Sequence, residues 1–178
     1  MVSKRQGLAA LVACVAIVGV LWTVLAARAG MFIPHDELLA VQPGEFSPDA
    51  ISAAKRVVSI DGRQVAYVDM GAGDPVILLH GCPFSVYEWR DVAPALAKHF
   101  RVIAPDLIGL GDTPVRLNDD YRLPENMRMV QALMDYLGVK SARFIGHDHG
   151  GAIVQLLMQH DPLRIDMAIP PLVGVAAR

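Results

Sequence analysis

The chain has 178 residues, 53% of them hydrophobic, and a formal net charge of −2 at pH 7. This length suggests one domain, and a near-neutral charge without a basic run gives no support to nucleic-acid binding. The two cysteines do not indicate a disulfide framework, because Cys14 lies inside an apolar N-terminal segment and leaves Cys82 alone.

The N-terminal segment at residues 7–27 contains no charged side chain. As a helix it would reach roughly 31 Å, enough to cross a hydrocarbon core of about 30 Å. Lys4 and Arg5 precede it and Arg28 alone follows closely, so the positive-inside rule predicts a single-pass membrane anchor with the domain outside the cytoplasm. The alternative is a cleaved signal peptide and a secreted protein, since residues 27–29 resemble an A-x-A cleavage site.

We divide the chain into three parts: an anchor or signal segment at 1–29, a linker at 30–55 and a domain at 56–178. The linker carries several prolines and shows no clear periodicity.

The domain begins with two predicted strands at 56–60 and 64–69, joined by the hairpin signal Asp61-Gly62. The turn Gly71-Ala72-Gly73-Asp74 does not fit the dinucleotide pattern G-x-G-x-x-G. A continuous apolar run at 75–79 predicts a strand that is buried on both faces.

His80-Gly81-Cys82-Pro83 follows that strand. Residues 85–88 have capping-box spacing, which predicts a helix that begins there and runs towards Lys98. Pro94 falls inside this helix and is expected to shift or kink it. The next predicted strand is 101–104.

A glycine-rich loop at 106–113 comes next, and Pro124 with Glu125 predicts the start of another helix. Gly138 predicts its end. The helix carries an apolar stripe that we interpret as core rather than as a cofactor site, formed by Met127, Val130, Leu133, Met134 and Leu137.

A strand at 141–145 and a helical pattern beyond residue 151 flank Gly146-His147-Asp148-His149-Gly150-Gly151. This is the context in which G-x-Nuc-x-G forms a nucleophile elbow, with aspartate as the nucleophile. The turn is strained, so its flanking glycines supply the space it needs, and the third glycine allows close packing of helix on strand. A last apolar stretch at 165–175 predicts one more strand.

Alternating strands and helices predict a mainly parallel sheet with helices on both faces. In such folds the chemistry lies at the carboxyl ends of the strands. The segments 80–83 and 106–113 and the residue Asp148 all fall at such ends.

Asp148 is suited to direct attack on carbon, since a carboxylate is already ionised at pH 7 and a helix N-terminus favours the anion. The product would be an ester with the enzyme, which an activated water must hydrolyse. Two alternatives stay open: Asp148 as a simple helix N-cap, and a metal site built on His147 and His149. No cofactor motif is evident.

At this point the chain resembles the α/β-hydrolase superfamily, and most closely its epoxide hydrolase and haloalkane dehalogenase branch. The likeness covers about residues 56–165 and rests on the three motifs at 80–83, 106–113 and 146–151, in that order.

The resemblance implies a small organic substrate and assigns Asp148 as nucleophile, with the backbone N–H groups of Cys82 and His149 as oxyanion-hole donors. Haloalkane dehalogenases usually have tryptophan where this chain has His149. The resemblance assigns structural roles to the other motif residues, which are His80, Gly81, Pro83, Asp106, Gly109, Gly111, Gly146, Gly150 and Gly151.

The family order is nucleophile, acid, histidine. After Asp148 this sequence offers only His149 and His160, and His160 falls at the helix behind the elbow. We therefore expect residues 1–178 to correspond to the N-terminal portion of such an enzyme, without lid or catalytic histidine, inactive in turnover and poorly soluble because of an open sheet edge. The alternative function is a membrane-anchored, non-catalytic binding domain of the same fold.

Overall fold

The computed structural model describes residues 48–117 and 119–169. Its described strands form one sheet in the order β1-β2-β4-β3-β5-β6. The strands β4, β3, β5 and β6 run parallel, whereas β2 is antiparallel to both β1 and β4. The strands are β1 Lys55–Ile60, β2 Arg63–Met70, β3 Pro75–Leu79, β4 Arg101–Pro105, β5 Ala142–Gly146 and β6 Ile165–Ile169.

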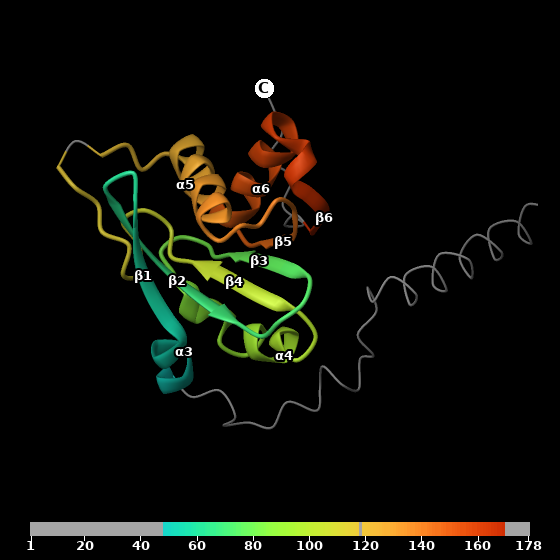
Figure 1. Ribbon diagram of the computed structural model, residues 1–178. Helices are drawn as coiled ribbons and strands as arrows, with labels where there is room; N and C mark the ends of the chain where they lie inside the picture. Colours follow the sequence, from blue (N-terminus) through green and yellow to red (C-terminus); the bar gives the residue numbers. More distant parts are fainter. Residues whose placement is uncertain (1–47, 118, 170–178) are drawn as a thin grey trace, which may run out of the picture. The chain divides into compact units, whose positions relative to one another are not determined.

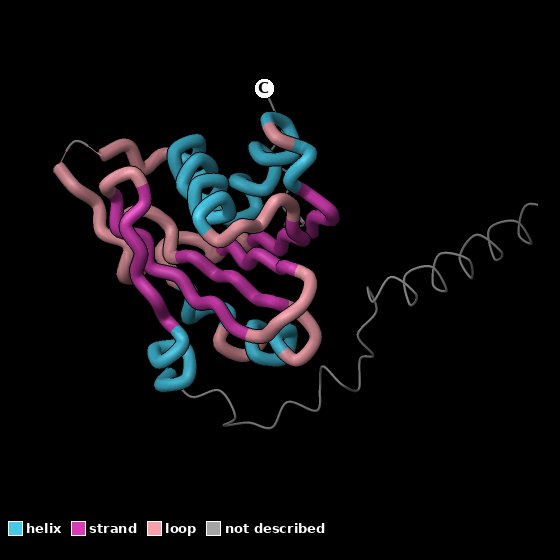
Figure 2. The backbone as a smooth tube through the Cα atoms, viewed as in Figure 1, coloured by secondary structure: helices cyan, strands magenta, loops and turns pink. Residues whose placement is uncertain are grey.

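Helices cover both faces of this sheet, as the alternating pattern predicted. Figure 1 shows α5 and α6 together on one face and α4 on the other, and Figure 2 shows the strands as one continuous layer between them. The helical elements are α3 Pro48–Ala54, η1 Val86–Trp89, α4 Ala93–Ala97, α5 Leu123–Tyr136, α6 His149–His160 and η2 Pro162–Arg164.

The β1–β2 hairpin is confirmed, with a two-residue loop at Asp61 and Gly62. Both loop residues have positive φ, 48° and 76°, which is the backbone that a tight hairpin turn needs. The predicted linker is corrected at its end, because residues 48–54 form α3 and β1 begins at Lys55. Ile51 of α3 is buried, so this helix is part of the packed domain.

The predicted buried strand at 75–79 is confirmed as β3. Val76 and Leu78 are buried on one side of it, and Ile77 and Leu79 belong to the core cluster shared with α5 and α6. Leu79 pairs in register with Gly146 of β5. This register places the segment after β3 beside the segment after β5, which is where the candidate site lies.

The predicted helix from 85 towards Lys98 is wrong. The chain instead forms the short 3₁₀ helix η1, and α4 then starts with Pro94 in its first turn. Proline is tolerated at a helix start and disfavoured inside a helix. The capping box is also wrong: the Ser85 side chain accepts from the Tyr87 N–H, and Glu88 binds elsewhere.

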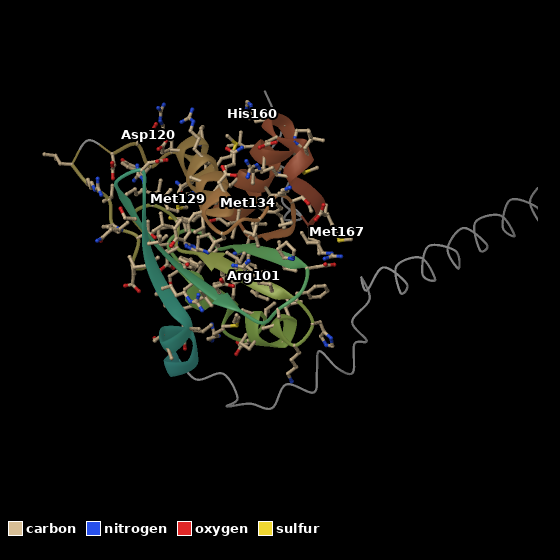
Figure 3. All side chains as sticks on the ribbon, in the orientation of Figure 1. Arg101, Asp120, Met129, Met134, His160 and Met167 are labelled. Carbon is tan, nitrogen blue, oxygen red and sulfur yellow. The ribbon has the colours of Figure 1, made fainter. Side chains whose placement is uncertain are left out.

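Helix α5 is confirmed with its apolar stripe in the core. Met129 and Met134 lie on its sheet-facing side in Figure 3 and are buried. Gly138 ends it, with φ of 70°. The Val139 N–H donates to Met134 O at 2.8 Å and the Gly138 N–H donates to Asp135 O at 3.1 Å, the Schellman pattern.

The last predicted strand is observed as β6, which ends at Ile169; residues 170–175 of that prediction lie outside the described residues. The predicted membrane segment, residues 7–27, also lies outside them and stays a prediction. Across 48–117 and 119–169, the structure contains no helix with the length and apolar character to cross a bilayer.

Candidate active site

Asp148 occupies a sharp turn between β5 and α6. Its φ is 48° and its ψ is −115°, a region that costs a residue with a side chain on the order of 1–3 kcal/mol. Its side chain makes no capping hydrogen bond to the helix. The geometry is therefore that of a strained elbow and does not fit the alternative of a simple N-cap, which adopts extended backbone.

The glycines around the elbow stand where side chains would collide. A Cβ on Gly146 would lie 2.6 Å from the carbonyl carbon and oxygen of Gly150. A Cβ on Gly150 would lie 2.0 Å from the backbone oxygen of Leu79 in β3. Helix α6 can thus approach the sheet only because these positions have no side chain.

We expect Gly150→Ala to lower the free energy of unfolding by about 1–3 kcal/mol, because the methyl group must displace backbone. Helix propensity alone predicts the opposite sign, a gain of roughly 0.5–1 kcal/mol for alanine over glycine inside a helix. Urea unfolding of both proteins measures the difference. An unchanged or higher stability in Gly150→Ala would contradict the close approach of α6 to β3.

The Asp148 carboxylate accepts a hydrogen bond from the backbone of the loop after β3, where the Cys82 N–H donates to Oδ2 at 3.0 Å. The backbone N–H of His149 also favours the anion, to a smaller extent. The Cys82 bond is the largest cause that lowers the pKa of Asp148 below its usual value, and the nearby rings of His149 and His147 add smaller contributions. The side chain is therefore an anion at neutral pH.

His80 is fully buried behind this site. Its Nδ1 lies 2.8 Å from Gly81 O, and its Nε2 lies 2.9 Å from the Leu107 backbone nitrogen. An Nδ1–H tautomer satisfies both contacts, since Nδ1 then donates to the carbonyl and Nε2 accepts from the N–H. Burial lowers the pKa of His80. The neutral ring thus joins the loop after β3 to the loop after β4.

Asp106 lies at the carboxyl end of β4 and is completely buried. Its Oδ1 accepts from the Val86 N–H at 2.7 Å, and its Oδ2 accepts from the Asp112 N–H at 2.9 Å. The Lys55 ammonium also donates to Oδ2 at 2.9 Å. A Cβ on Gly111 would lie 2.3 Å from the Asp106 carboxyl carbon, so the loop can close on this carboxylate only with glycine there.

Sequence reasoning missed Lys55, which fell inside the predicted linker. Its ammonium is bound by Asp106 and by Asp112, the second at 2.5 Å. Partial burial opposes its charge, but the hydrogen bonds to Asp112 and Asp106 outweigh this and raise the pKa of Lys55. No sequence signal marked this contact, because the carboxylates are 51 and 57 positions away.

Glu88 is a second residue that sequence reasoning missed. Its Oε2 accepts from the Gly81 N–H at 2.8 Å, and its Oε1 lies 2.6 Å from Nδ1 of His147. It therefore contacts both segments that surround Asp148. Within residues 48–117 and 119–169 there is no group of three side chains suited to hold a metal ion. Of the two histidines in the alternative metal site, His147 contacts Glu88, whereas His149 lines the pocket beside the elbow.

A pocket of about 330 Å³ opens beside the elbow. Both predicted oxyanion donors, Cys82 and His149, contribute to its wall, as does Gly109 of the glycine-rich loop. Its lining is mainly apolar and comprises Cys82, Leu107, Ile108, Gly109, Leu110, Val115, Tyr121, Leu123, Asn126 and His149. Gly81, Pro83 and Gly111 lie in the same motifs but do not line the pocket.

Comparison with known proteins places this arrangement in a family. Residues 74–169 match the family model described as alpha/beta hydrolase fold. The chain is 47% identical over 96 residues to a soluble epoxide hydrolase of Corynebacterium sp. (strain C12), covering 53% of this chain and 32% of that protein. It is 34% identical over 119 residues to a haloalkane dehalogenase of Mesorhizobium japonicum, covering 66% and 38%.

Solved structures of epoxide hydrolases also superpose on this chain. The epoxide hydrolase CorEH without ligand superposes with a TM-score of 0.61 at 36% identity, over 70% of this chain and 45% of that one. An epoxide hydrolase from Vigna radiata gives a TM-score of 0.65 at 31% identity, over 70% and 41%. The chain spans about a third of the length of the curated relatives it matches. With a family model that covers more than half of it, this chain belongs to the alpha/beta hydrolase fold family.

Proposed function

We propose that Asp148 is the nucleophile of an epoxide hydrolase-like or haloalkane dehalogenase-like reaction. The observation that carries the proposal is the hydrogen bond from the Cys82 N–H to Oδ2 of this carboxylate at 3.0 Å. When Asp148 forms an ester through Oδ1, Oδ2 becomes the ester carbonyl oxygen. The donor that stabilises negative charge on this oxygen is therefore in position before the reaction starts.

The first step needs no base. Oδ1 attacks a substrate carbon, a carbon–oxygen ester bond forms, and either the epoxide carbon–oxygen bond or the carbon–halogen bond breaks. The epoxide oxygen takes a proton from water and stays on the substrate carbon skeleton, whereas a halide leaves as an anion. In the second step a water loses a proton to a general base and attacks the ester carbonyl carbon, and the developing oxyanion is Oδ2. Collapse of this intermediate breaks the bond between the carbonyl carbon and Oδ1, so the alcohol or diol leaves with Oδ1 and the water oxygen stays in the regenerated carboxylate.

The pocket favours an apolar substrate. Its one carboxamide side chain, Asn126, is already occupied, because Oδ1 accepts from the Ile108 N–H at 2.8 Å and Nδ2 donates to Tyr121 O at 2.9 Å. An aryl or alkyl group of the substrate would then pack against the apolar side chains of Leu107, Ile108 and Leu110.

Hydrolysis of the ester needs a general base that faces the ester carbon. Two histidines close to the elbow are committed elsewhere: His80 is buried between two loops, and His147 contacts Glu88. We propose that residues 1–178 form the ester once and then retain it; repeated release of product would assign the base to His149, which lines the pocket.

Intact-mass spectrometry tests the proposal. After exposure to a small aryl epoxide we expect the protein to gain the full mass of the epoxide once. After exposure to a primary alkyl bromide its mass should rise once by the mass of the alkyl bromide minus that of hydrogen bromide. Continued release of diol or bromide, at many equivalents per protein molecule, would contradict the retention of the ester. Binding of either compound without a covalent product would support the alternative of a non-catalytic binding domain.

The pH dependence of ester formation follows from the lowered pKa of Asp148. A lowered pKa means that the anion persists as the pH falls, so the rate should stay level from about pH 8 to pH 5 and drop only below the ordinary aspartate value of about 3.9. The rate with an alkyl bromide at fixed ionic strength measures this. A drop centred well above the ordinary aspartate value would contradict control of the rate by the Asp148 carboxylate.

A further inference from the structure

The Glu88 carboxylate lies between two segments that converge on the proposed nucleophile. One oxygen, Oε2, accepts from the Gly81 N–H at 2.8 Å, and the other, Oε1, lies 2.6 Å from Nδ1 of His147. Gly81 directly precedes Cys82, and His147 directly precedes Asp148. A single side chain is thus bound one residue upstream of both partners in the Cys82–Asp148 hydrogen bond.

Glu88 is itself held in place. It lies in η1, whose first residue, Val86, donates its N–H to the buried Asp106 carboxylate at 2.7 Å. Its side chain is 19% exposed, compared with 55% for His147. The carboxylate is therefore the more buried partner of this pair, and the histidine ring is the more exposed one.

Hydrogen bonds hold the backbone on both sides of Gly81. The Gly81 carbonyl oxygen lies 2.8 Å from Nδ1 of His80 and accepts from the Phe84 N–H at 3.0 Å, and the His80 carbonyl oxygen accepts from the Gly150 N–H at 3.1 Å. Glu88 supplies the acceptor of the Gly81 N–H and is the member of this set that also contacts His147. Gly81 has no side chain, and a Cβ there would lie 2.9 Å from the Cβ of Asp148. Glycine has the widest backbone freedom of any residue. Loss of the Glu88 carboxylate leaves the Gly81 N–H without this acceptor and His147 without this contact, so the Cys82 N–H, one residue further along, should shift relative to Asp148.

We propose that Glu88 is a positioning residue for the oxyanion hole, which fixes the Cys82 N–H on the Asp148 carboxylate by binding the Gly81 N–H and His147 together. This inference rests on the proposed function for its kinetic consequence. Its structural consequence, restraint of the two consecutive N–H groups of Gly81 and Cys82, is independent of any reaction.

The kinetic test compares Glu88→Ala and Glu88→Gln in the rate of ester formation with an aryl epoxide. In Glu88→Ala we expect the maximal rate to fall on the order of tenfold with little change in the half-saturating concentration, because the donor geometry is lost and the pocket is not. Glutamine retains an oxygen for the Gly81 N–H and gains an N–H for Nδ1 of His147, so Glu88→Gln should recover most of the rate.

Ser85→Ala is the matched control, because it removes the Oγ acceptor of the Tyr87 N–H in the same short helix without touching Gly81 or His147. It should react at the wild-type rate. A Glu88→Ala protein that also reacts at the wild-type rate would overturn the inference, as would an equal loss in Glu88→Ala and Ser85→Ala.

Amide hydrogen exchange separates failure of this inference from failure of the proposed function. In Glu88→Ala, exchange at the N–H groups of Gly81 and Cys82 should accelerate at least about tenfold relative to wild type and Ser85→Ala. Glu88→Gln should retain the protection. Equal protection in all four proteins would overturn the role of Glu88, whether or not the wild-type protein forms an ester at Asp148.

Discussion

Replacing Asp106 by alanine should destabilise the domain by about 3–5 kcal/mol, the range measured when one partner of a buried ion pair is removed. Its carboxylate is completely buried, and its removal leaves the N–H groups of Val86 and Asp112 without their acceptor. Lys55 loses one of its two carboxylate partners at the same time. Typical domains have only 5–15 kcal/mol of stability in total, so the loss should be visible as a large fall in the unfolding midpoint.

Asp120→Ala is the control for this prediction. Asp120 also accepts several hydrogen bonds, all from Arg122, and these hold its pKa at about 2. It lies on the loop before α5, labelled in Figure 3, and its side chain is 36% exposed, whereas that of Asp106 is completely buried. Since exposed ion pairs contribute little, urea unfolding of Asp120→Ala should match wild type. Equal midpoints for Asp106→Ala and wild type would contradict the role of the buried carboxylate.

Replacing Asp148 should abolish ester formation. In Asp148→Ala the attacking oxygen is absent, and in Asp148→Asn the carboxamide is a far weaker nucleophile than a carboxylate. Both variants should fold, because the Asp148 side chain is exposed and neither replacement enlarges the side chain at this strained position. Quantitative intact-mass spectrometry against an aryl epoxide measures the loss.

Cys82 requires its own control, because its thiol is free, exposed and part of the same pocket wall, and thiols also react with epoxides and alkyl bromides. The proposed role of Cys82 uses its backbone N–H alone. Cys82→Ala should therefore form the ester at close to the wild-type rate. Loss of all covalent product in Cys82→Ala, with retention in Asp148→Ala, would assign the reaction to the thiol.

The features predicted correctly from sequence depend on local patterns. Asp61-Gly62 specifies a tight hairpin by itself, the apolar run at 75–79 specifies a buried strand, and Gly138 specifies the end of α5. The position of Asp148 between β5 and α6 is local in the same sense. Each of these depends on a few consecutive residues whose backbone preferences agree with the fold.

The features that sequence reasoning missed depend on contacts between distant segments. Glu88 has capping-box spacing from Ser85, but the Gly81 N–H and His147, brought together by the pairing of β3 with β5, take its carboxylate instead. Lys55 looked like linker because its partners Asp106 and Asp112 become neighbours only when β1 and β2 pair beside β4. Periodicity carries no information about such pairs.

Peptide fragmentation locates the covalent product and thereby identifies the nucleophile. The protein is treated with the aryl epoxide, digested at low pH to preserve esters, and sequenced by tandem mass spectrometry with and without hydroxylamine. We expect one modified site, Asp148, and loss of the modification with hydroxylamine, which cleaves esters and leaves thioethers. A hydroxylamine-resistant product on Cys82, with Asp148 unmodified, would contradict this expectation.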